Sequence, residues 1–201
     1  TAFGDRKGAL VAIEPATGGL LALVSTPTYD PNLFVDGIDS ANWRELNESP
    51  DKPMVNRALN GAYPPGSTFK PFMALAALTT GKRRPEQTIS DPGSFTFGGH
   101  TFRDDKKGGH GSVDMYKAIV QSCDTYYYIL ANDMGIDNIS NFMGQLGLGQ
   151  RTGIDIEGES EGILPSQAWK KKRFKKPEQQ KWYAGETISI GIGQGYNAYT
   201  P

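Results

Sequence analysis

The stretch YPPGSTFKPFMALAAL, residues 63–78, constrains the fold more than any other part of the chain. Its Pro-Pro-Gly start breaks regular structure, and the apolar residues that follow recur at helical spacing. Pro71 is compatible with a helix only in the first turn, where its missing N–H costs no hydrogen bond. The pattern therefore predicts a helix from about residue 67 to residue 80, with Gly81 as its stop.

Ser67 and Lys70 lie three residues apart in this helix, so both side chains are on one face. A serine hydroxyl is a weak nucleophile unless a base lies beside it, and burial favours a neutral, proton-accepting lysine amine. A serine at a helix start is also a common cap, so the bare pattern S-x-x-K carries little weight. It occurs again at Ser49 and Lys52, where Pro50 intervenes and no apolar run follows, and there we interpret it as chance.

A second serine, Ser122, occurs with Asp124 in QSCDTYYY, at the expected start of another helix. Taken alone, this spacing is typical of helix capping. Other serine chemistries find no support in the residues, because the sequence contains no G-x-S-x-G and neither His100 nor His110 lies near a serine in a triad pattern. A serine and lysine pair is the better candidate for nucleophilic chemistry.

The remaining segments predict a chain with both strands and helices. Two β-rich runs, 8–14 and 20–25, flank PATGG, which is a hairpin-turn sequence. We interpret 25–62 as an extended linker and 90–111 as a glycine-rich loop with a small hairpin. The other expected elements are helices at 113–121, 123–134 and 137–146, a solvated loop at 169–176 (WKKKRFKK), and a strand or turn at 186–196.

Composition and charge exclude several classes of function. The 201 residues suit one domain with a real core, and a net charge of −1 provides no global attraction for nucleic acid or an anionic membrane. The sequence has no apolar run of about 18 residues and no signal-peptide layout, so we expect any anchor to lie outside this chain. The single cysteine excludes an internal disulfide. For the basic run at 169–176, a dock for partner proteins is the alternative to a solvated loop.

The two serine motifs and the segments around them resemble the transpeptidase domain of class B penicillin-binding proteins, most closely the elongation-specific branch of Gram-negative bacteria. The resemblance covers nearly the whole chain and rests on VAIEPATGGLLALVSTPTYDPNLFVDGI, YPPGSTFKPF, SCDTYYY, GIDIEGESEGILPS and GIGQGY. That family carries three motifs, S-x-x-K, S-x-N or S-x-D, and K-T-G. The resemblance assigns Ser67 and Lys70 to the first motif and Ser122 and Asp124 to the second.

Two features depart from the family pattern. Asp124 stands where many members have asparagine, which adds a negative charge beside the site. K-T-G occurs nowhere in the sequence, so we expect residues 1–201 to be a partial transpeptidase domain that lacks the strand bearing the third motif. Because that strand supplies part of the oxyanion hole in the family, an inactive fragment stays open as an alternative.

The resemblance implies an α/β fold of the penicillin-binding and serine β-lactamase type, with an antiparallel sheet flanked by helices. The implied reaction is peptidoglycan D,D-transpeptidation, in which Ser67 attacks the penultimate D-alanine of a stem peptide and leaves an acyl-enzyme. Lys70 is assigned as general base, Ser122 as the hydroxyl that relays a proton towards the leaving amine, and Asp124 as a group that orients substrate or holds Lys70. No organic cofactor is needed, because protein groups supply the nucleophile, base and donors.

The implied partners are stem peptides ending in D-Ala-D-Ala, β-lactams, a shape-determining glycosyltransferase and other elongation-complex proteins, and not nucleic acid. The implied location is periplasmic, in a protein anchored to the inner membrane. A serine β-lactamase or penicillin sensor would share Ser67 and Lys70, although no glutamate can be assigned to activate water for deacylation. A non-catalytic scaffold fragment is the other alternative.

A metal site is a separate hypothesis for the segment 91–123. Asp91, Asp104, His110 and Cys123 are ligand types that zinc accepts, and together they could form a closed, tetrahedral structural site. Asp105 and His100 are alternative ligands. The competing interpretation is a small buried cysteine beside solvated loop histidines, because the spacing matches no standard zinc pattern.

Overall fold

The computed structural model describes residues 3–201 and has a mixed α/β fold of helices and antiparallel strand pairs. The chain divides into two compact units, which are described separately. The first unit consists of the residues up to Tyr63 together with 151–161 and 200–201, and the second consists of 64–150 and 162–199. No helix within the described residues combines the length and apolar character needed to cross a membrane.

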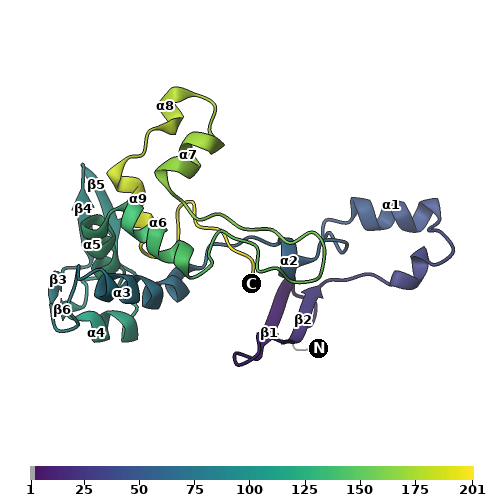
Figure 1. The fold of residues 1–201 in the computed structure, drawn as a ribbon, viewed down its shortest axis with the longest axis horizontal. Coiled ribbons are helices and arrows are strands. Elements are labelled where there is room, and N and C mark those ends of the chain that lie inside the picture. Colours follow the sequence, from purple (N-terminus) through teal and green to yellow (C-terminus); the bar gives the residue numbers. More distant parts are fainter. Residues whose placement is uncertain (1–2) are drawn as a thin grey trace. The chain divides into compact units, whose positions relative to one another are not determined.

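The first unit contains the predicted hairpin. Strands β1 (Gly8–Ile13) and β2 (Leu20–Thr26) pair antiparallel, with Gly8 opposite Thr26 and an irregularity in register between Ala12 and Ile13 (Figure 1). In the turn, the Glu14 carboxylate accepts hydrogen bonds from the backbone N–H and the hydroxyl of Thr17, both at 2.8 Å. The two β-rich runs are therefore confirmed as one hairpin.

The expected extended linker at 25–62 is wrong in part, because it contains three short helical segments. These are the 3-10 helix η1 (Pro31–Phe34), α1 (Ser40–Glu48) and α2 (Arg57–Asn60). Each begins at a polar side chain that accepts hydrogen bonds from the first turn: Asp30, Asp39 and Asn56. The Asp and Asn residues that suggested a linker are therefore helix caps.

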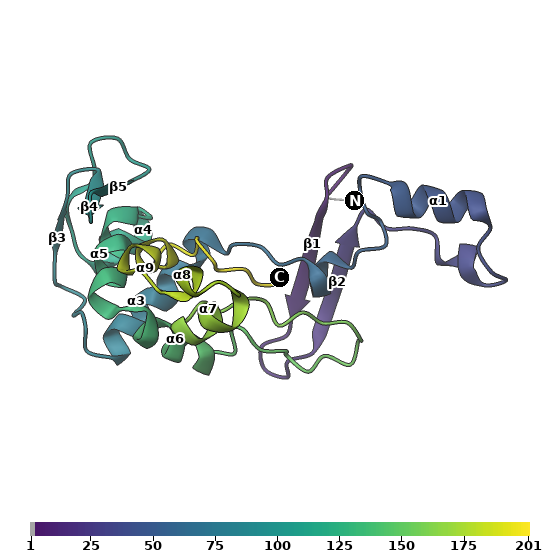
Figure 2. The ribbon, with the colours of Figure 1, turned by 90° about the horizontal axis from the view of Figure 1, so that it is seen from above.

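Helices form the core of the second unit. The helix predicted from the serine and lysine motif is present as a 3-10 turn, η2 (Gly66–Phe69), followed by α3 (Lys70–Thr79). Helices α4 (Met115–Val120), α5 (Asp124–Met134) and α6 (Ile136–Gln145) confirm the other three predicted helices. Helix α5 packs against α3 and against α9 (Ala184–Ile190), as Figures 1 and 2 show.

The glycine-rich segment contains the small hairpin that was predicted and one further strand pair. Strands β4 (Ser94–Phe97) and β5 (His100–Arg103) form the hairpin, and they contact α5. Strand β3 (Ile89–Asp91) pairs with β6 (Gly111–Val113) and so closes the base of the segment. Within the described residues the strands make three separate two-stranded antiparallel sheets.

The basic run is not a loop, because most of it lies in helix α7 (Gln167–Arg173), which α8 (Pro177–Gln180) follows. The Ser166 hydroxyl caps α7 by accepting the Trp169 N–H at 2.9 Å. Lys170 is buried, and its Nζ donates to the two carboxylate oxygens of Glu186 at 2.5 and 2.7 Å. One lysine of the run therefore fastens α7 to α9, while Lys171, Lys172, Arg173, Lys175 and Lys176 are exposed.

The expected strand or turn at 186–196 is wrong for its first half, which is the end of helix α9. The alternating TISI pattern suggested a strand, but tertiary contacts override that local preference. Ile188 and Ile190 are fully buried in the core that contains α5. Gly191 follows α9 and leaves no room for a side chain, because a Cβ there would lie 2.6 Å from the Tyr127 carbonyl oxygen.

We expect Glu186→Gln to lower the free energy of unfolding by about 3 kcal/mol, because it leaves the buried Lys170 ammonium without its carboxylate. Urea unfolding of the variant measures this effect. Glu178→Gln is the matched control, since Glu178 is the exposed acid of neighbouring α8 and should change stability by less than about 0.5 kcal/mol. Equal stabilities for the two variants would contradict a structural role for the Lys170–Glu186 pair.

Candidate active site

Ser67 lies in the 3-10 turn η2, directly before α3. The turn is fixed by a hydrogen bond from the Gly66 N–H to the Gly193 carbonyl oxygen at 3.0 Å. Gly66 has a φ of +57°, which glycine adopts without strain. A side chain at Gly193 would collide with the Gly66 carbonyl oxygen. The two glycines therefore let the loop after α9 set the position of Ser67.

Lys70 is the first residue of α3, and its side chain is only 2% exposed. Its Nζ donates to the Ser122 carbonyl oxygen at 2.6 Å, to Ser122 Oγ at 3.0 Å and to Asp124 Oδ1 at 2.5 Å. An ammonium group has three hydrogens, so all three have acceptors. The Lys70 side chain thus has three hydrogen-bond acceptors around its Nζ, and one of them is the Asp124 carboxylate.

Ser122 connects Lys70 with Ser67. Its Oγ donates to Ser67 Oγ at 3.0 Å and accepts from Lys70 Nζ. Hydroxyl hydrogens rotate, so the same oxygen positions can carry a proton in either direction. The arrangement is a continuous path for a proton between the Ser67 hydroxyl and the lysine amine.

The backbone of Ser122 is in the left-handed region, with a φ of +53°, which is uncommon outside glycine. The neighbouring backbone holds it there: the Ser122 N–H bonds the Ile119 carbonyl oxygen, and the Cys123 N–H bonds that of Ala118. The bond from Lys70 to the Ser122 carbonyl oxygen adds to these. This conformation points both the hydroxyl and the carbonyl oxygen of one residue at the same ammonium.

The four residues of the two serine motifs are therefore together, although η2 and the start of α5 are more than 50 residues apart in the chain. Ser67 Oγ and Lys70 Nζ are joined by hydrogen bonds through Ser122 Oγ, which belongs to the residue that the resemblance implied as a proton relay towards the leaving amine. A cavity of about 630 Å³ lies elsewhere in the second unit, between the β4–β5 hairpin and the start of α9, and none of the four residues lines it.

The four residues of the metal hypothesis also meet. Asp91, Asp104, His110 and Cys123 are all buried, and each offers a ligand atom within 4.8 Å of the others. His110 Nδ1 lies 2.8 Å from Asp91 Oδ2 and 3.4 Å from Asp104 Oδ1. The Cys123 thiol contacts Asp91 Oδ2 at 3.4 Å and Asp104 Oδ2 at 3.5 Å.

The carboxylates and the thiol of this cluster have shifted pKa values. Burial raises the pKa of Asp91, but the hydrogen bonds from the Gly93 N–H and from His110 outweigh it and hold the pKa at about 2. Burial also raises the pKa of the Cys123 thiol, and the charges of the two carboxylates raise it further. Two carboxylates, an imidazole and a thiol in one buried space are a donor set that suits tetrahedral Zn²⁺.

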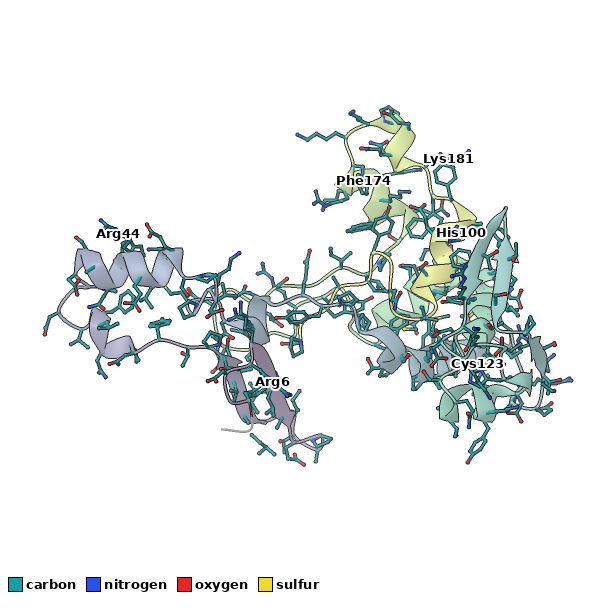
Figure 3. All side chains as sticks on the ribbon, turned by 180° about the vertical axis from the view of Figure 1, so that it is seen from behind. Arg6, Arg44, His100, Cys123, Phe174 and Lys181 are labelled. Carbon is teal, nitrogen blue, oxygen red and sulfur yellow. The ribbon has the colours of Figure 1, made fainter. Side chains whose placement is uncertain are left out.

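The two alternative ligands lie outside the cluster. His100 is exposed on β5, and its ring packs against Phe102 with centroids 4.7 Å apart. Asp105 is also exposed. Figure 3 shows His100 and Cys123 at separate places in the second unit. The structure therefore favours the first-named ligand set over the alternatives.

The two clusters share one short segment. Cys123 lies between Ser122 and Asp124 in the chain, and it caps α5 by accepting the Tyr126 N–H on its sulfur at 3.4 Å. The Asp104 carboxylate accepts the Thr125 N–H at 2.7 Å and so holds the same turn from the other side. Any group that orders the Asp–His–Cys cluster therefore also orders Ser122 and Asp124.

The sequence of the chain matches a protein family and several curated proteins. Residues 8–201 match the family described as penicillin binding protein transpeptidase domain. The chain is 52% identical over 201 residues to the peptidoglycan D,D-transpeptidase MrdA of Acinetobacter baumannii, covering 99% of the chain and 29% of the relative. It is 49% identical over 203 residues to MrdA of Escherichia coli K12, covering 100% of the chain and 31% of the relative. The chain thus spans about a third of the length of these relatives.

The fold of the chain is similar to solved structures of penicillin-binding proteins. PBP2 of Pseudomonas aeruginosa in complex with WCK 5153 aligns with a TM-score of 0.92 at 47% identity, covering 99% of this chain and 45% of that one. PBP2 of Helicobacter pylori in complex with MreC aligns with a TM-score of 0.92 at 37% identity, covering 98% and 36%. Penicillin-binding protein A of Mycobacterium tuberculosis, as a penicillin G acyl-enzyme, aligns at 0.81 and 28% identity, covering 97% and 43%.

Proposed function

The chain belongs to the penicillin-binding protein transpeptidase family, as the sequence predicted, and from this premise we propose that it carries the acylating centre of a peptidoglycan D,D-transpeptidase. One observation carries the proposal: the hydrogen-bonded path from Ser67 Oγ through Ser122 Oγ to the buried Nζ of Lys70. An isolated cap serine would need no such path, whereas a serine nucleophile needs a base to take its proton.

In the proposed reaction, Ser67 Oγ attacks the carbonyl carbon of the penultimate D-alanine of a stem peptide. The Ser67 proton passes to Ser122 Oγ while the Ser122 proton passes to Lys70 Nζ. Collapse of the tetrahedral intermediate breaks the peptide bond, and the same path returns the proton to the departing amine of the last D-alanine. An amine of a second stem peptide then attacks the ester, which releases Ser67 and forms the cross-link.

Asp124 has a defined role in this scheme. Lys70 can accept a proton only when it is neutral, and all three of its hydrogens are bonded at rest. We propose that one of these protons moves across the 2.5 Å contact to Asp124 Oδ1 as substrate binds. The pair is electrically neutral before and after that shift, so the transfer creates no isolated charge in a buried site.

Mass spectrometry of the intact protein after incubation with a penicillin tests this function. We expect one covalent adduct per chain that is stable for minutes or longer. Because the relatives are about three times longer than this chain and K-T-G is not in its sequence, the assay is run on the longest available form of the protein as well. Absence of an adduct on that form would contradict the proposal and favour a non-catalytic scaffold.

The β-lactamase alternative makes a different prediction with the same reagents. A hydrolase deacylates quickly, so it would turn over a chromogenic cephalosporin many times and show no lasting adduct. A transpeptidase would release about one equivalent of product and then stop. Release of D-alanine from a pentapeptide substrate further separates a transpeptidase from a penicillin sensor.

We also propose that Asp91, Asp104, His110 and Cys123 hold a structural zinc ion. Two observations support this proposal. All four side chains are buried around one space. The negative charges of Asp91 and Asp104 lie beside the Cys123 thiol, and a bound cation would neutralise them. Bound metal would fix the turn that presents Ser122 and Asp124 and would take no part in the reaction. No organic cofactor is needed in the proposed chemistry, since side chains supply the nucleophile and the base.

We expect His110→Ala to remove the metal and to lower the thermal midpoint by several degrees, because metal binding stabilises only the folded site. Metal content by plasma mass spectrometry and thermal unfolding measure the two effects. His100→Ala is the control, since His100 is exposed and outside the cluster. Zinc well below one equivalent in parent protein purified without chelators would refute the site.

The partners and location are proposals that rest on relatives. The Helicobacter pylori PBP2 structure contains MreC, and another similar structure is of a peptidoglycan synthase complex that coordinates polymerisation and cross-linking. We propose that the protein carrying this chain works on the periplasmic side of the inner membrane with a shape-determining glycosyltransferase. Co-purification of that glycosyltransferase with the tagged, full-length protein tests this, and its absence from the purified complex would oppose it.

A further inference from the structure

Tyr127 lies under the Lys70 ammonium and has no place in the reaction scheme above. It is on α5, three residues after Asp124, so both side chains are on the same face of the helix. The centre of its ring is 5.6 Å from Lys70 Nζ, which is within the range of a cation–π contact. Tyr127 is fully buried and Lys70 nearly so, and the contact is therefore shielded from water.

We infer that Tyr127 is a positioning residue, and that the face of its ring holds the Lys70 ammonium beside the Ser122 hydroxyl. The inference rests on the proposed function, because it concerns how the base of that reaction is held. A lysine side chain has four flexible carbons, and hydrogen bonds to Ser122 and Asp124 fix only its tip. The Tyr127 ring contacts the ammonium in addition to its three hydrogen-bond acceptors, and so limits the movement of the side chain.

The residues that pack around Tyr127 hold its ring in place. Its backbone carbonyl lies against Gly191, where even a Cβ would approach to 2.6 Å. Its ring packs edge-on against Tyr126, with centroids 5.3 Å apart. The core around α5 therefore leaves the ring little room to move, so the position of Lys70 is set by packing as well as by charge.

The proposed contact with Lys70 involves the ring face of Tyr127 and not its hydroxyl. Within the described residues that oxygen is buried and has no hydrogen-bond partner. A phenylalanine ring has the same face and the same size without the hydroxyl. Phenylalanine should therefore replace Tyr127 without loss, whereas an aliphatic residue should not.

Tyr126 provides a matched control. It belongs to the same helix, is 1% exposed, and its hydroxyl is equally without a partner among the described residues. Its ring, however, lies 5.7 Å from the guanidinium carbon of Arg83 and not beside Lys70. Truncating Tyr126 removes a comparable buried ring from the core, including its edge-on contact with Tyr127, but the backbone contact of Tyr127 with Gly191 and the contact of its ring with Lys70 remain.

The experiment measures acylation by a fluorescent penicillin in stopped flow, which separates the non-covalent dissociation constant from the acylation rate constant at saturation. We expect Tyr127→Leu to lower the rate constant about tenfold, within the range of a desolvated cation–π contact, with little change in the dissociation constant. Tyr127→Phe and Tyr126→Leu should stay within about twofold of the parent. Tyr127→Met, whose flexible side chain adapts to irregular space in a core, serves if the leucine variant does not fold.

Three outcomes would overturn the inference. The first is equal acylation rates for Tyr127→Leu and Tyr126→Leu, since that would make the effect one of core stability. The second is a slow Tyr127→Phe, which would assign the effect to the hydroxyl. The third is a change confined to the dissociation constant. A parent protein that forms no adduct at all would instead defeat the proposed function, and the two failures are therefore distinguishable.

Discussion

Ser67→Ala is expected to abolish covalent labelling of the protein by a penicillin. The proposed acyl-enzyme is an ester of Ser67 Oγ, so the alanine variant lacks the oxygen that would form it. Ser122 Oγ is 3.0 Å away, but it is bonded to Lys70 Nζ and lies on the path of the proton. Intact-mass measurement of parent and variant gives the result directly, and we expect a full adduct in one and none within detection in the other.

The sequence itself supplies the control for this experiment. Ser49 and Lys52 have the same S-x-x-K spacing, but they follow α1 in the first unit and have no apolar helix behind them. The Ser49→Ala variant should therefore form the same amount of penicillin adduct as the parent protein. An adduct of unchanged mass on Ser67→Ala would contradict the assignment of the nucleophile, and peptide mapping would then locate the true site.

Much of the second unit was predictable because its sequence patterns and its tertiary contacts favour the same structure. The helix after Ser67 has an apolar pattern, a tolerated proline and a glycine stop, and the buried residues of α6 recur at helical spacing. The errors came where local preference and tertiary contact disagree. The TISI segment reads as a strand, but burial of Ile188 and Ile190 in the core makes it helical.

The basic run illustrates a second limit of sequence patterns. Eight residues rich in lysine and arginine suggest solvation, and five of the six cations are indeed exposed. The exception, Lys170, is buried because Glu186 lies 16 positions further along the chain and pairs with it. No pattern within the run could reveal a partner that only the fold brings close.

The candidate site shows the same division. The resemblance of the two serine motifs to the family selected Ser67, Lys70, Ser122 and Asp124, and the mix of ligand types suggested the Asp–His–Cys cluster; the structure brings the members of each set together. The proton path through Ser122 depends on the left-handed backbone conformation of this residue, and a serine in a sequence does not predict that conformation. Tyr127 was also missed, although its position three residues after Asp124 is a signal that helical spacing could have provided.

The segment Ser122–Cys123–Asp124 joins the two clusters, and this explains how one turn can be both strained and well defined. Ser122 adopts an unfavourable conformation that only surrounding contacts maintain. Cys123 anchors the turn to Asp91 and Asp104, while Asp124 anchors it to Lys70. Loss of the Asp–His–Cys cluster should therefore slow acylation as well as lower stability.

Lys70→Arg is the second change for which we expect a large effect. Arginine keeps a positive charge opposite Asp124, yet it is not deprotonated in proteins and cannot accept the proton of Ser67. General base catalysis is worth about 10²- to 10⁴-fold, so the acylation rate constant should fall by at least about 100-fold. Stopped-flow acylation measures the change, and Lys52→Arg, at the chance copy of the motif, should leave it unaltered.

The arginine is larger than lysine in a nearly closed site, so its thermal midpoint is measured beside the rate. Lys70→Met keeps a linear side chain without charge and separates the loss of the base from a change in packing. If Lys70 is the base, both variants acylate slowly, since neither can take a proton. If Lys70 only provides charge for Ser67 and Asp124, the arginine variant stays within a few-fold of the parent while the methionine variant fails. That second result would move the role of base to Asp124, which among the residues that the structure describes is the only other hydrogen-bond partner of Lys70 that can accept a proton and hold it.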